Sequence, residues 1–180
     1  MRRSAAPHPA GIPAHLAIQP DMATAHINIG SNLGDSRAYL ARAVAGVALL
    51  SEDYEVQVSD IIESEPWGFT SSHRFLNVGM NIHTTLSVPE LMERLHAVER
   101  SISDVPHRHA DGSYADRTVD IDLICLDDTV VRQPGIEVPH PRMHLREFVL
   151  KPMIQLWPQW VHPQLRLTPA EMLAGLKKMS

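Results

Sequence analysis

The sequence lacks the features of several protein classes. Its 180 residues contain one cysteine, Cys125, which excludes an internal disulfide framework and predicts a reducing, cytoplasmic location. No apolar run approaches the roughly 18 residues of a membrane span, so no membrane association is expected. The 16 basic residues are outnumbered by 21 acidic ones, and the net charge is -5. This balance argues against a nucleic-acid partner bound through basic patches.

What is present has the composition of one globular domain. The chain is 44% hydrophobic and 21% charged, and its length suffices for a single core. Prolines interrupt every apolar stretch within residues 1–22, so we expect a flexible N-terminal extension there. Residues 23–180 show no internal repeat and no composition change that would mark a second unit, and they are predicted to form a single catalytic domain.

Hydrophobic periodicity predicts an alternation of strands and helices. Strands are expected over residues 25–30, 54–64, 75–84 and 116–125, and helices over 36–50, 87–102, 146–156 and from 168 onward. Capping boxes at Ser87–Glu90 and Thr168–Glu171 indicate where two of these helices begin. The order βαββαβ predicts an α+β, ferredoxin-like sandwich, in which helices cover one face of an antiparallel sheet and an active-site groove lies on the other.

The segment DRTVDIDL, Asp116 to Leu123, places two carboxylates on a strand that otherwise looks apolar. Alternate side chains share a face, so Asp120 and Asp122 should lie side by side at roughly 6.5 Å spacing. The opposite face should carry Val119, Ile121, Leu123 and Cys125. Two adjacent carboxylates repel unless a Lys, an Arg or a hard cation such as Mg²⁺ lies between them. Taken alone, the pair is equally compatible with a solvated strand face.

Five stretches of the sequence, one of which contains the two aspartates, follow one another along the chain in a recognisable order. They are INIGSNLGD (27–35), EPWGF (65–69), RFLNVGMNI (74–82), DRTVDIDLI (116–124) and VPHPRMHLREFVLKP (138–152). Together they resemble the 6-hydroxymethyl-7,8-dihydropterin pyrophosphokinase family of folate biosynthesis. The resemblance implies two substrates, ATP and 6-hydroxymethyl-7,8-dihydropterin, with transfer of the β,γ-diphosphate to the hydroxymethyl oxygen and release of AMP. It also makes other folate-pathway enzymes possible partners.

The resemblance implies a metal site at the aspartate pair. Asp120 and Asp122 would hold two Mg²⁺ ions that bridge the ATP phosphates, which agrees with the strand geometry. Arg117 matches the arginine of the same motif and is expected to act in catalysis and to bind phosphate. The alternative for Arg117 is an ion pair with Asp116 or Asp120.

On the nucleotide side, the resemblance assigns His140 to a nucleotide contact and Arg146 to a phosphate contact. Arg142 is close enough in sequence to replace Arg146. His96 falls at a position that is often a polar nucleotide contact in the family, although a surface role on its helix is the stronger alternative. Glu99, one turn further on, is equally compatible with a structural role.

A pterin ring needs aromatic walls for its faces and an amide for its polar edge. The resemblance assigns this site to Ser64, Trp67, Gly68, Phe75, Asn77, Tyr114 and Phe148. Glu65 stands where the family usually has proline. The turn from Gly30 to Asn32 is expected beside the site, either as a direct contact or as a connector between strand and helix.

One interval departs from the family pattern. The family usually has Gly-Arg after the long helix and Trp-Gly-Pro before the motif arginine. Here Ser103 and Asp104 occupy the first position, Tyr114 replaces the tryptophan and Asp116 replaces the proline. We expect Arg108, on the same loop, to act as the missing catalytic arginine, because such loops close by hinge motion and tolerate insertions. A transition-metal site at the two histidines flanking Arg108 has no third ligand nearby and is a weak alternative.

Two other function classes stay open from sequence. One is a different metal-dependent nucleotide transferase with a DxD motif, against which the predicted pterin residues argue. The other is a catalytically weakened module that binds pterin and ATP, for which the departing loop is the evidence. A repulsive carboxylate pair serves little purpose in such a module, so an active enzyme is the preferred interpretation.

Overall fold

The computed structural model describes residues 22–68, 71–103 and 116–179. Its elements in chain order are β1 (Ala23–Ser31), α1 (Ser36–Ala48), β2 (Val56–Val58), β3 (Ile62–Ser64), β4 (Phe75–Thr84), α2 (Val88–Ile102), β5 (Asp120–Leu126), β6 (Val131–Gln133), β7 (Ile136–Val138), a 3-10 turn (Met143–Leu145), α3 (Glu147–Leu156) and α4 (Pro169–Met179). The extension predicted for residues 1–22 lies outside the described residues except for Met22. Within those ranges, no helix has the length and apolarity needed to cross a bilayer.

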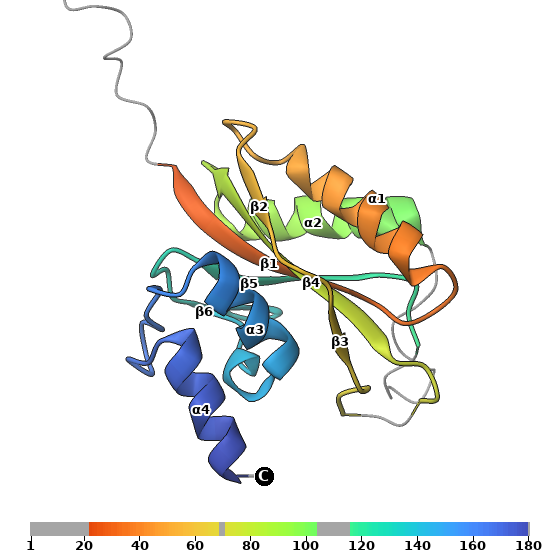
Figure 1. The fold of residues 1–180 in the computed structure, drawn as a ribbon. Helices are drawn as coiled ribbons and strands as arrows, with labels where there is room; N and C mark the ends of the chain where they lie inside the picture. The colour runs from red at the N-terminus through yellow and green to blue at the C-terminus, as the bar shows by residue number, and fades with distance from the viewer. Residues whose placement is uncertain (1–21, 69–70, 104–115, 180) are drawn as a thin grey trace, which may run out of the picture.

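A five-stranded sheet organises the domain. Its hydrogen-bonded order is β2-β4-β1-β5, and β3 pairs with β4 beyond the end of β2. All of these pairings are antiparallel, and α1 and α2 lie together on one face of the sheet (Figure 1). The predicted α+β fold, with helices against an antiparallel sheet, is therefore confirmed.

The face toward α1 and α2 carries the larger hydrophobic core. Ala25, Ile27 and Ile29 of β1 are fully buried there, because alternate residues of a strand share a face. Leu91 and Leu95 of α2 are also buried in this core, one helical turn apart. The capping box predicted at Ser87 and Glu90 is present at the start of α2. This layer holds the strands in one register, which positions the side chains on the opposite face of the sheet.

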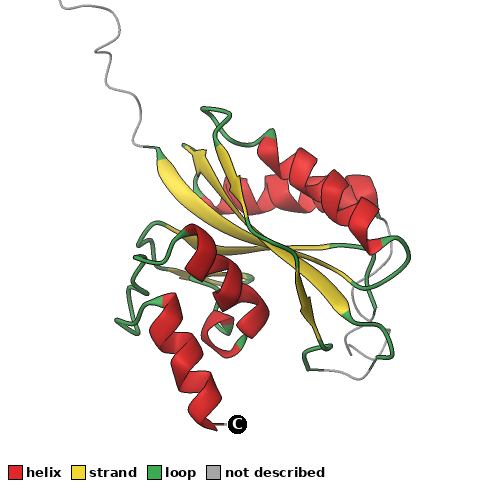
Figure 2. Ribbon diagram, viewed as in Figure 1, coloured by secondary structure: helices red, strands yellow, loops and turns green. Residues whose placement is uncertain are grey.

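The opposite face is less open than predicted. It carries a second core made by β5 with α3 and α4, in which Ile124, Met143, Leu150 and Met153 are fully buried. Figure 2 shows these two helices below the sheet, on the side away from α1 and α2. The groove is confined to the part of the sheet that α3 leaves uncovered. The helix predicted over 146–156 thus has a structural role in closing one end of the site.

The single strand predicted over residues 54–64 is in fact two short strands. Val58 pairs with Met80 and Ile62 pairs with Asn77, so three residues on this strand face two on β4. The extra residue is a bulge. Ser59 anchors it by bonding Gly79 twice, with its backbone N–H and with its Oγ, both at 2.9 Å. The bulge moves Ser64 onto the groove face.

A second bulge corrects the predicted face of Cys125. Ile27 pairs with Leu123, but the next pair is His26 with Cys125, so Ile124 is the extra residue. Cys125 therefore lies in the second core and not beside Leu123 in the first. Asp120 and Asp122 precede the bulge, and their shared face is as predicted.

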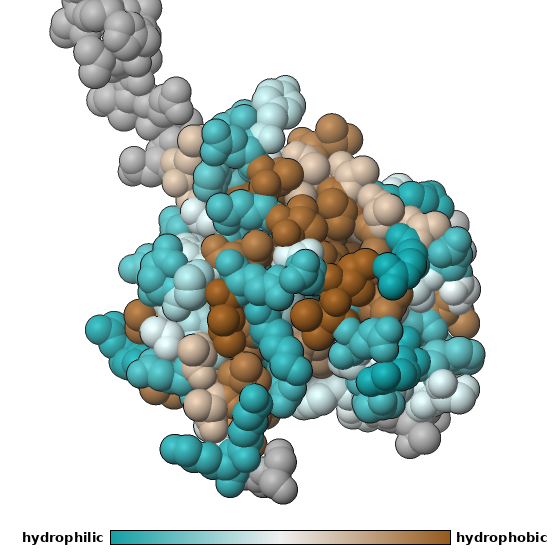
Figure 3. All heavy atoms as spheres, viewed as in Figure 1, coloured by the Kyte–Doolittle hydropathy of each residue, from teal (hydrophilic) through white to brown (hydrophobic). Residues whose placement is uncertain are grey.

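β2 forms one edge of the sheet, and its side chains are partly exposed. Val56 and Val58 are 38% and 43% exposed, and Leu49 and Tyr54 nearby are more so. Apolar side chains gather on this side of the molecule over α1 and the neighbouring strands (Figure 3). The short length of β2 limits the row of unpaired backbone groups that this edge presents.

His26 is a fully buried histidine on the second face of β1. Its Nδ1 donates to Asn81 Oδ1 at 2.6 Å. Burial lowers the pKa of His26 to about 4, although the bond with Asn81 acts in the opposite direction. The unfolded chain therefore takes up this proton at a higher pH than the folded chain, and stability is lost as the pH falls from 6.5 toward 4.

We predict that His26→Gln weakens the acid sensitivity of folding. Between pH 6.5 and 5, proton uptake by unfolded His26 should cost the wild type ~2 kcal/mol of unfolding free energy. Urea unfolding at both pH values should therefore show a smaller decrease for the variant by about that amount. His96→Gln, on the surface of α2, serves as the control. Equal decreases for wild type and His26→Gln would contradict this assignment.

Candidate active site

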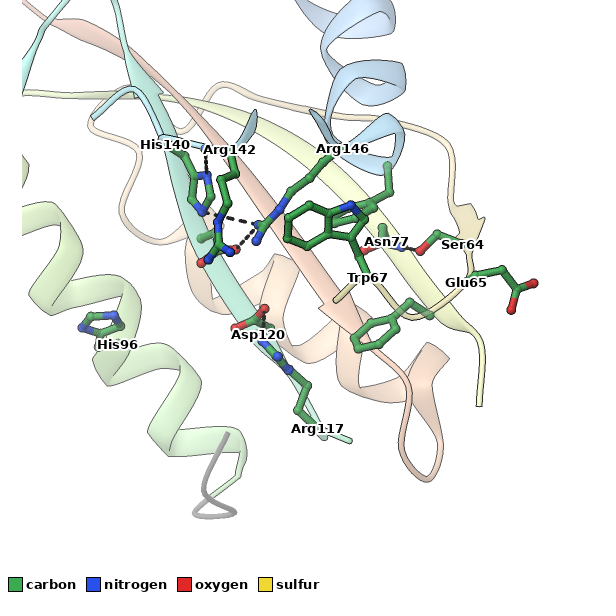
Figure 4. A pocket seen from close by; sticks show the side chains of 13 residues that line it. Ser64, Glu65, Trp67, Asn77, His96, Arg117, Asp120, His140, Arg142 and Arg146 are labelled. Carbon is green, nitrogen blue, oxygen red and sulfur yellow. Dashed lines mark hydrogen bonds and ion pairs between the residues drawn. The ribbon is translucent and has the colours of Figure 1, made fainter. Parts of the chain in front are cut away.

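The predicted site residues converge on one cavity of about 280 Å³ on the groove face. Its lining comprises Ser64, Glu65, Trp67, Phe75, Asn77, His96, Arg117, Asp120, Asp122, His140, Arg142, Arg146 and Phe148. Figure 4 shows Arg142, Arg146 and Trp67 grouped at one side of Asp120, with His96 on α2 at the other. Gly68 is exposed and is not among the lining residues. Arg108 and Tyr114 lie outside the described residues.

Each aspartate of the DxD strand faces an arginine. Arg117 Nη1 lies 2.5 Å from Asp120 Oδ2, and Arg146 Nη1 lies 3.5 Å from Asp122 Oδ2. Both arginine side chains are at most 10% exposed, so these ion pairs are largely shielded from water. The ion pair between Arg117 and Asp120, given above as an alternative, is therefore present, and it is compatible with a catalytic role at the same place.

Burial dominates the titration of two cavity groups. It raises the pKa of Asp122, against the opposing effect of Arg146, Arg117 and Arg142. It lowers the pKa of His140 to about 4, and there Arg146 and Arg142 act in the same direction as burial. His140 is therefore neutral at pH 7. Its Nδ1 accepts the backbone N–H of Arg142 at 3.2 Å, and its Nε2 lies 3.3 Å from Arg146 Nη1.

Asn77 is held rigidly at the other end of the cavity. Its Nδ2 donates to Ser64 Oγ at 3.0 Å and to the Ile62 carbonyl at 3.3 Å, and the residue is 2% exposed. Gly30 on the neighbouring strand makes room for it, because a Cβ there would lie 3.0 Å from Asn77 Oδ1 and 3.6 Å from the Phe75 ring. Phe75 and Asn77 thus present a ring and an amide on one strand face, as predicted.

Aromatic rings flank the arginines. The Arg146 guanidinium lies 4.7 Å from the centre of the Trp67 ring and 5.7 Å from that of Phe148. Arg142 lies 5.3 Å from the same Trp67 ring. Contacts of this kind between a guanidinium and an aromatic face are attractive and orient the planar cation. The loop after β3 is thereby connected to both arginines of the 140–148 segment.

Glu99 holds the exposed edge of β5. Its Oε2 accepts the backbone N–H of Ile121, the residue between the two aspartates, at 2.8 Å. Burial raises the pKa of Glu99 to about 7, and the charges of Asp120 and Asp122 add to that effect. Glu99 is not among the cavity-lining residues, which favours the structural alternative.

A second cavity of about 300 Å³ adjoins the first and shares His96, Asp122 and His140 with it. Its remaining lining is mostly apolar near α2 and polar near the β6–β7 hairpin: Met92, Leu95, Ile121, Leu123, Gln133, Gly135, Ile136, Glu137 and Pro141. Apolar walls with polar edges suit a flat heteroaromatic group. The two cavities meet at the three residues that they share.

The donor set at β5 fits Mg²⁺. Asp120 and Asp122 offer carboxylate oxygens on one strand face, opening into the cavity, and Mg²⁺ prefers oxygen ligands. Mg²⁺ is usually held by one or two protein carboxylates and completes its shell with water and substrate phosphate. The neighbouring Arg117, Arg142 and Arg146 suit phosphate oxygens, because a guanidinium binds them through two parallel hydrogen bonds.

The sequence pattern did not indicate a group of hydrogen-bonded polar residues that lies outside the cavity lining. Asp116 accepts hydrogen bonds from Asn32 at 2.6 Å and from His73 at 3.1 Å. Asn32 was expected in a turn beside the site, but neither a bond to Asp116 nor any role for His73 followed from the pattern. The one available signal was the charged residue at 116, where the resembled family has proline.

Comparison with known proteins agrees with this geometry. Residues 26–158 match the family described as 7,8-dihydro-6-hydroxymethylpterin-pyrophosphokinase, HPPK. The chain belongs to this family. A 2-amino-4-hydroxy-6-hydroxymethyldihydropteridine pyrophosphokinase of Aquifex aeolicus is 32% identical over 143 residues, covering 79% of this chain and 85% of the relative. One from Porphyromonas gingivalis is 33% identical over 144 residues, covering 79% and 96%.

Solved structures show the same fold. The crystal structure of an HPPK-DHPS protein in complex with substrates superimposes with a TM-score of 0.65 at 10% sequence identity, covering 88% of this chain. The chain spans 44% of that longer protein. At this identity the match concerns the fold alone, and the family membership depends on the sequence comparisons.

We predict that His140 keeps its neutral ring well below pH 6.5. An NMR titration of its ring resonances should have a midpoint near 4. Arg146→Ala should raise this midpoint, because removing a nearby positive charge favours the imidazolium form. Lys151→Ala, on the outer part of α3, is the control and should leave it unchanged. A midpoint near 6.5 in the wild type would contradict the burial of this ring.

Proposed function

We propose that this chain transfers the β,γ-diphosphate of ATP to the 6-hydroxymethyl oxygen of 6-hydroxymethyl-7,8-dihydropterin and releases AMP. One observation carries the proposal: the paired carboxylates of β5, the arginines and the Phe75–Asn77 face line one cavity. A reaction of this kind needs the phosphates and the accepting hydroxyl to be held in line and close together. Family membership supports the reaction class and a role in folate biosynthesis.

The pterin is proposed to bind at the Asn77 end. Asn77 presents an amide for the polar edge of the ring, and Ser64 fixes the orientation of that amide. Phe75 and Phe148 offer apolar ring faces on which the pterin can stack. Trp67 and Gly68 belong to the loop next to this end. Tyr114 is proposed for the same site from the sequence resemblance.

ATP is proposed to span the two cavities. Its phosphates would bind Arg117, Arg142 and Arg146, and its base would enter the cavity with apolar walls near Leu95 and Leu123. Nε2 of His140 lies 3.3 Å from Arg146 Nη1, so the histidine ring stands beside a guanidinium proposed to bind phosphate. His96 borders both cavities and would lie near the ribose.

Two Mg²⁺ ions are proposed as the cofactors, held by Asp120 and Asp122. When bound, they would neutralise phosphate charge and help to align the polyphosphate. Within the chain, Arg117 and Arg146 would stabilise charge on the transferred group and on the leaving AMP. Arg108, which lies outside the described residues, is proposed from the sequence as a further catalytic cation.

The chemical step breaks the bond between the β-phosphorus and the oxygen that joins it to the α-phosphate. The hydroxymethyl oxygen forms the new bond to the β-phosphorus and releases its proton to water. AMP leaves with the electron pair of the broken bond. Rigid placement of the pterin by Asn77 and of the phosphates by the arginines accounts for the protein's own part in this step.

We predict that the protein forms AMP when mixed with ATP, Mg²⁺ and 6-hydroxymethyl-7,8-dihydropterin. Asp120→Ala and Asp122→Ala should each lower turnover by at least 100-fold, because each removes a carboxylate from the proposed metal site. Circular dichroism should show that both variants are still folded, since neither side chain lies in a core, although each leaves Arg117 or Arg146 without its carboxylate partner and should lower the unfolding free energy. Chromatography of the nucleotides checks the product: ADP would exclude diphosphate transfer, and tight binding without product would favour the binding module.

A substitution at Gly30 should act selectively on the pterin. In Gly30→Ala the new Cβ would crowd Asn77 Oδ1 at 3.0 Å, so Asn77 must shift. We expect KM for the pterin to rise about 10-fold, roughly 1.4 kcal/mol, with a much smaller change in KM for ATP. Gly175→Ala in α4 has open space around its Cβ and is the matched control. A larger effect on ATP than on pterin would place Asn77 outside the pterin site.

A physical association with other enzymes of the folate pathway is a further proposal. This chain covers 44% of the protein named HPPK-DHPS. We propose that the present chain associates, as a separate polypeptide, with another enzyme of the folate pathway. Co-purification with a dihydropterin-consuming enzyme from the same source would test this.

A further inference from the structure

Four polar side chains from three separate segments meet outside the cavity lining, close to the start of β4 and β5. Asn32 lies in the turn after β1, Ser71 and His73 lie in the connection before β4, and Asp116 lies just before β5. We refer to these four residues as the Asp116 cluster. None of them is among the residues that line the cavity. Any effect of the cluster on the reaction must therefore pass through neighbouring residues.

Asp116 is the centre of the cluster. Asn32 Nδ2 donates to Asp116 Oδ1 at 2.6 Å, and His73 Nδ1 donates to Asp116 Oδ2 at 3.1 Å. Ser71 also bonds the carboxylate, and its Oγ accepts the backbone N–H of His73 at 3.0 Å. Burial raises the pKa of Asp116, but the hydrogen bonds from Ser71, Asn32 and His73 outweigh it and hold that pKa below its usual range.

Asn32 connects the cluster to the phosphate side of the site. Its backbone N–H donates to the Arg117 carbonyl at 3.2 Å, and its Oδ1 accepts the Arg117 N–H at 2.9 Å. Asn32 and Arg117 are 3% and 8% exposed, so water competes little for these bonds. The Arg117 side chain then reaches Asp120 at 2.5 Å. The cluster thus fixes the backbone position from which the Arg117 side chain extends toward Asp120.

Ser71 and His73 connect the cluster to the pterin side. They belong to the segment between Trp67 and Phe75, two residues that line the cavity. Asn32 Nδ2 also reaches the His73 carbonyl at 3.5 Å, at the distance limit of a hydrogen bond. The Arg117 guanidinium lies 6.0 Å from the Phe75 ring, so the two sides approach each other there. One carboxylate therefore holds the segments that present both substrate sites.

We propose that Asp116 is a positioning residue that couples pterin binding to ATP binding, by joining the segment before β4 to the backbone of Arg117. The inference depends on the proposed function, because it assumes that both substrates use this cavity. A ligand that orders one of the joined segments lowers the cost of ordering the other, so each substrate improves the binding of its partner by the same factor.

The experiment measures this coupling directly. The dissociation constant of 6-hydroxymethyl-7,8-dihydropterin is determined by calorimetry with and without saturating Mg²⁺ and α,β-methylene-ATP, in which the bond to be broken is replaced. The ratio of the two constants is the coupling factor. We expect at least 10-fold tighter pterin binding with the analogue in the wild type, and a coupling factor at least 5-fold smaller in Asp116→Ala.

The chain offers a matched control at the far end of β4. There His83 Nδ1 lies 2.6 Å from Asp53 Oδ2, the same type of histidine–aspartate contact, remote from the cavity. Asp53→Ala should keep the wild-type coupling factor. His73→Ala should reduce coupling less than Asp116→Ala, because the His73 side chain is 57% exposed and such pairs are weak. The double variant at 73 and 116 should match Asp116→Ala alone.

Each outcome decides between coupling and a simpler role. If Asp116→Ala weakens both substrates separately but keeps the coupling factor, Asp116 has only a structural role and the proposal is wrong. A coupling factor near 1 in the wild type would also overturn it, even with AMP formed normally. If Asp116→Ala is too unstable to test, Asp116→Asn, which keeps one acceptor oxygen, should still show reduced coupling. Absence of both pterin binding and AMP would contradict the proposed function itself.

Discussion

The pairing of β1 with β5 is the constraint on which the site depends. Asn28 pairs with Asp122 and Gly30 pairs with Asp120, so both carboxylates stand on the face opposite the main core. Ile27 and Ile29 fix this register, because a slip by one residue would exchange the buried and cavity faces. The same register places Gly30 beside Asn77 of β4. One set of backbone hydrogen bonds thereby aligns the metal end and the pterin end.

Periodicity in the sequence predicted the elements better than their internal irregularities. Alternation identified β1, β4 and β5, and the capping boxes marked the helices that begin near Ser87 and Thr168. Two of the errors were bulges, because a pattern of period two does not show which residue is unpaired. The β6–β7 hairpin was not predicted, and the second core covers part of the face expected to be open. A bulge is favoured where an outside group satisfies the unpaired backbone. Ser59 with Gly79, and Gln155 with the N–H of Asp60, do this for the first one.

Most of the cavity lining could be predicted because it lies in the five matched stretches of sequence. Ser64 and His96 lie outside those stretches and were assigned from their neighbouring positions. The connections between segments could not. Asn32 and Asp116 are 84 positions apart, and Ile121 and Glu99 are 22 apart, so their contacts depend on how the loops and helices pack. The polar residues His26 and Asn28, alternating with Ile27 and Ile29, were a usable signal that β1 has a second polar face. That signal does not specify their partners.

Charge balance explains how a strand with two neighbouring aspartates is compatible with a stable fold. Arg117 and Arg146 each pair with one carboxylate, and a shielded charge without a partner would cost several kcal/mol. Arg142 lines the same cavity and brings a further positive charge that phosphate groups can meet. Binding a polyphosphate with divalent cations would exchange one set of ion pairs for another in the same place. The arginines thus serve the folded chain and its proposed substrate through the same donors.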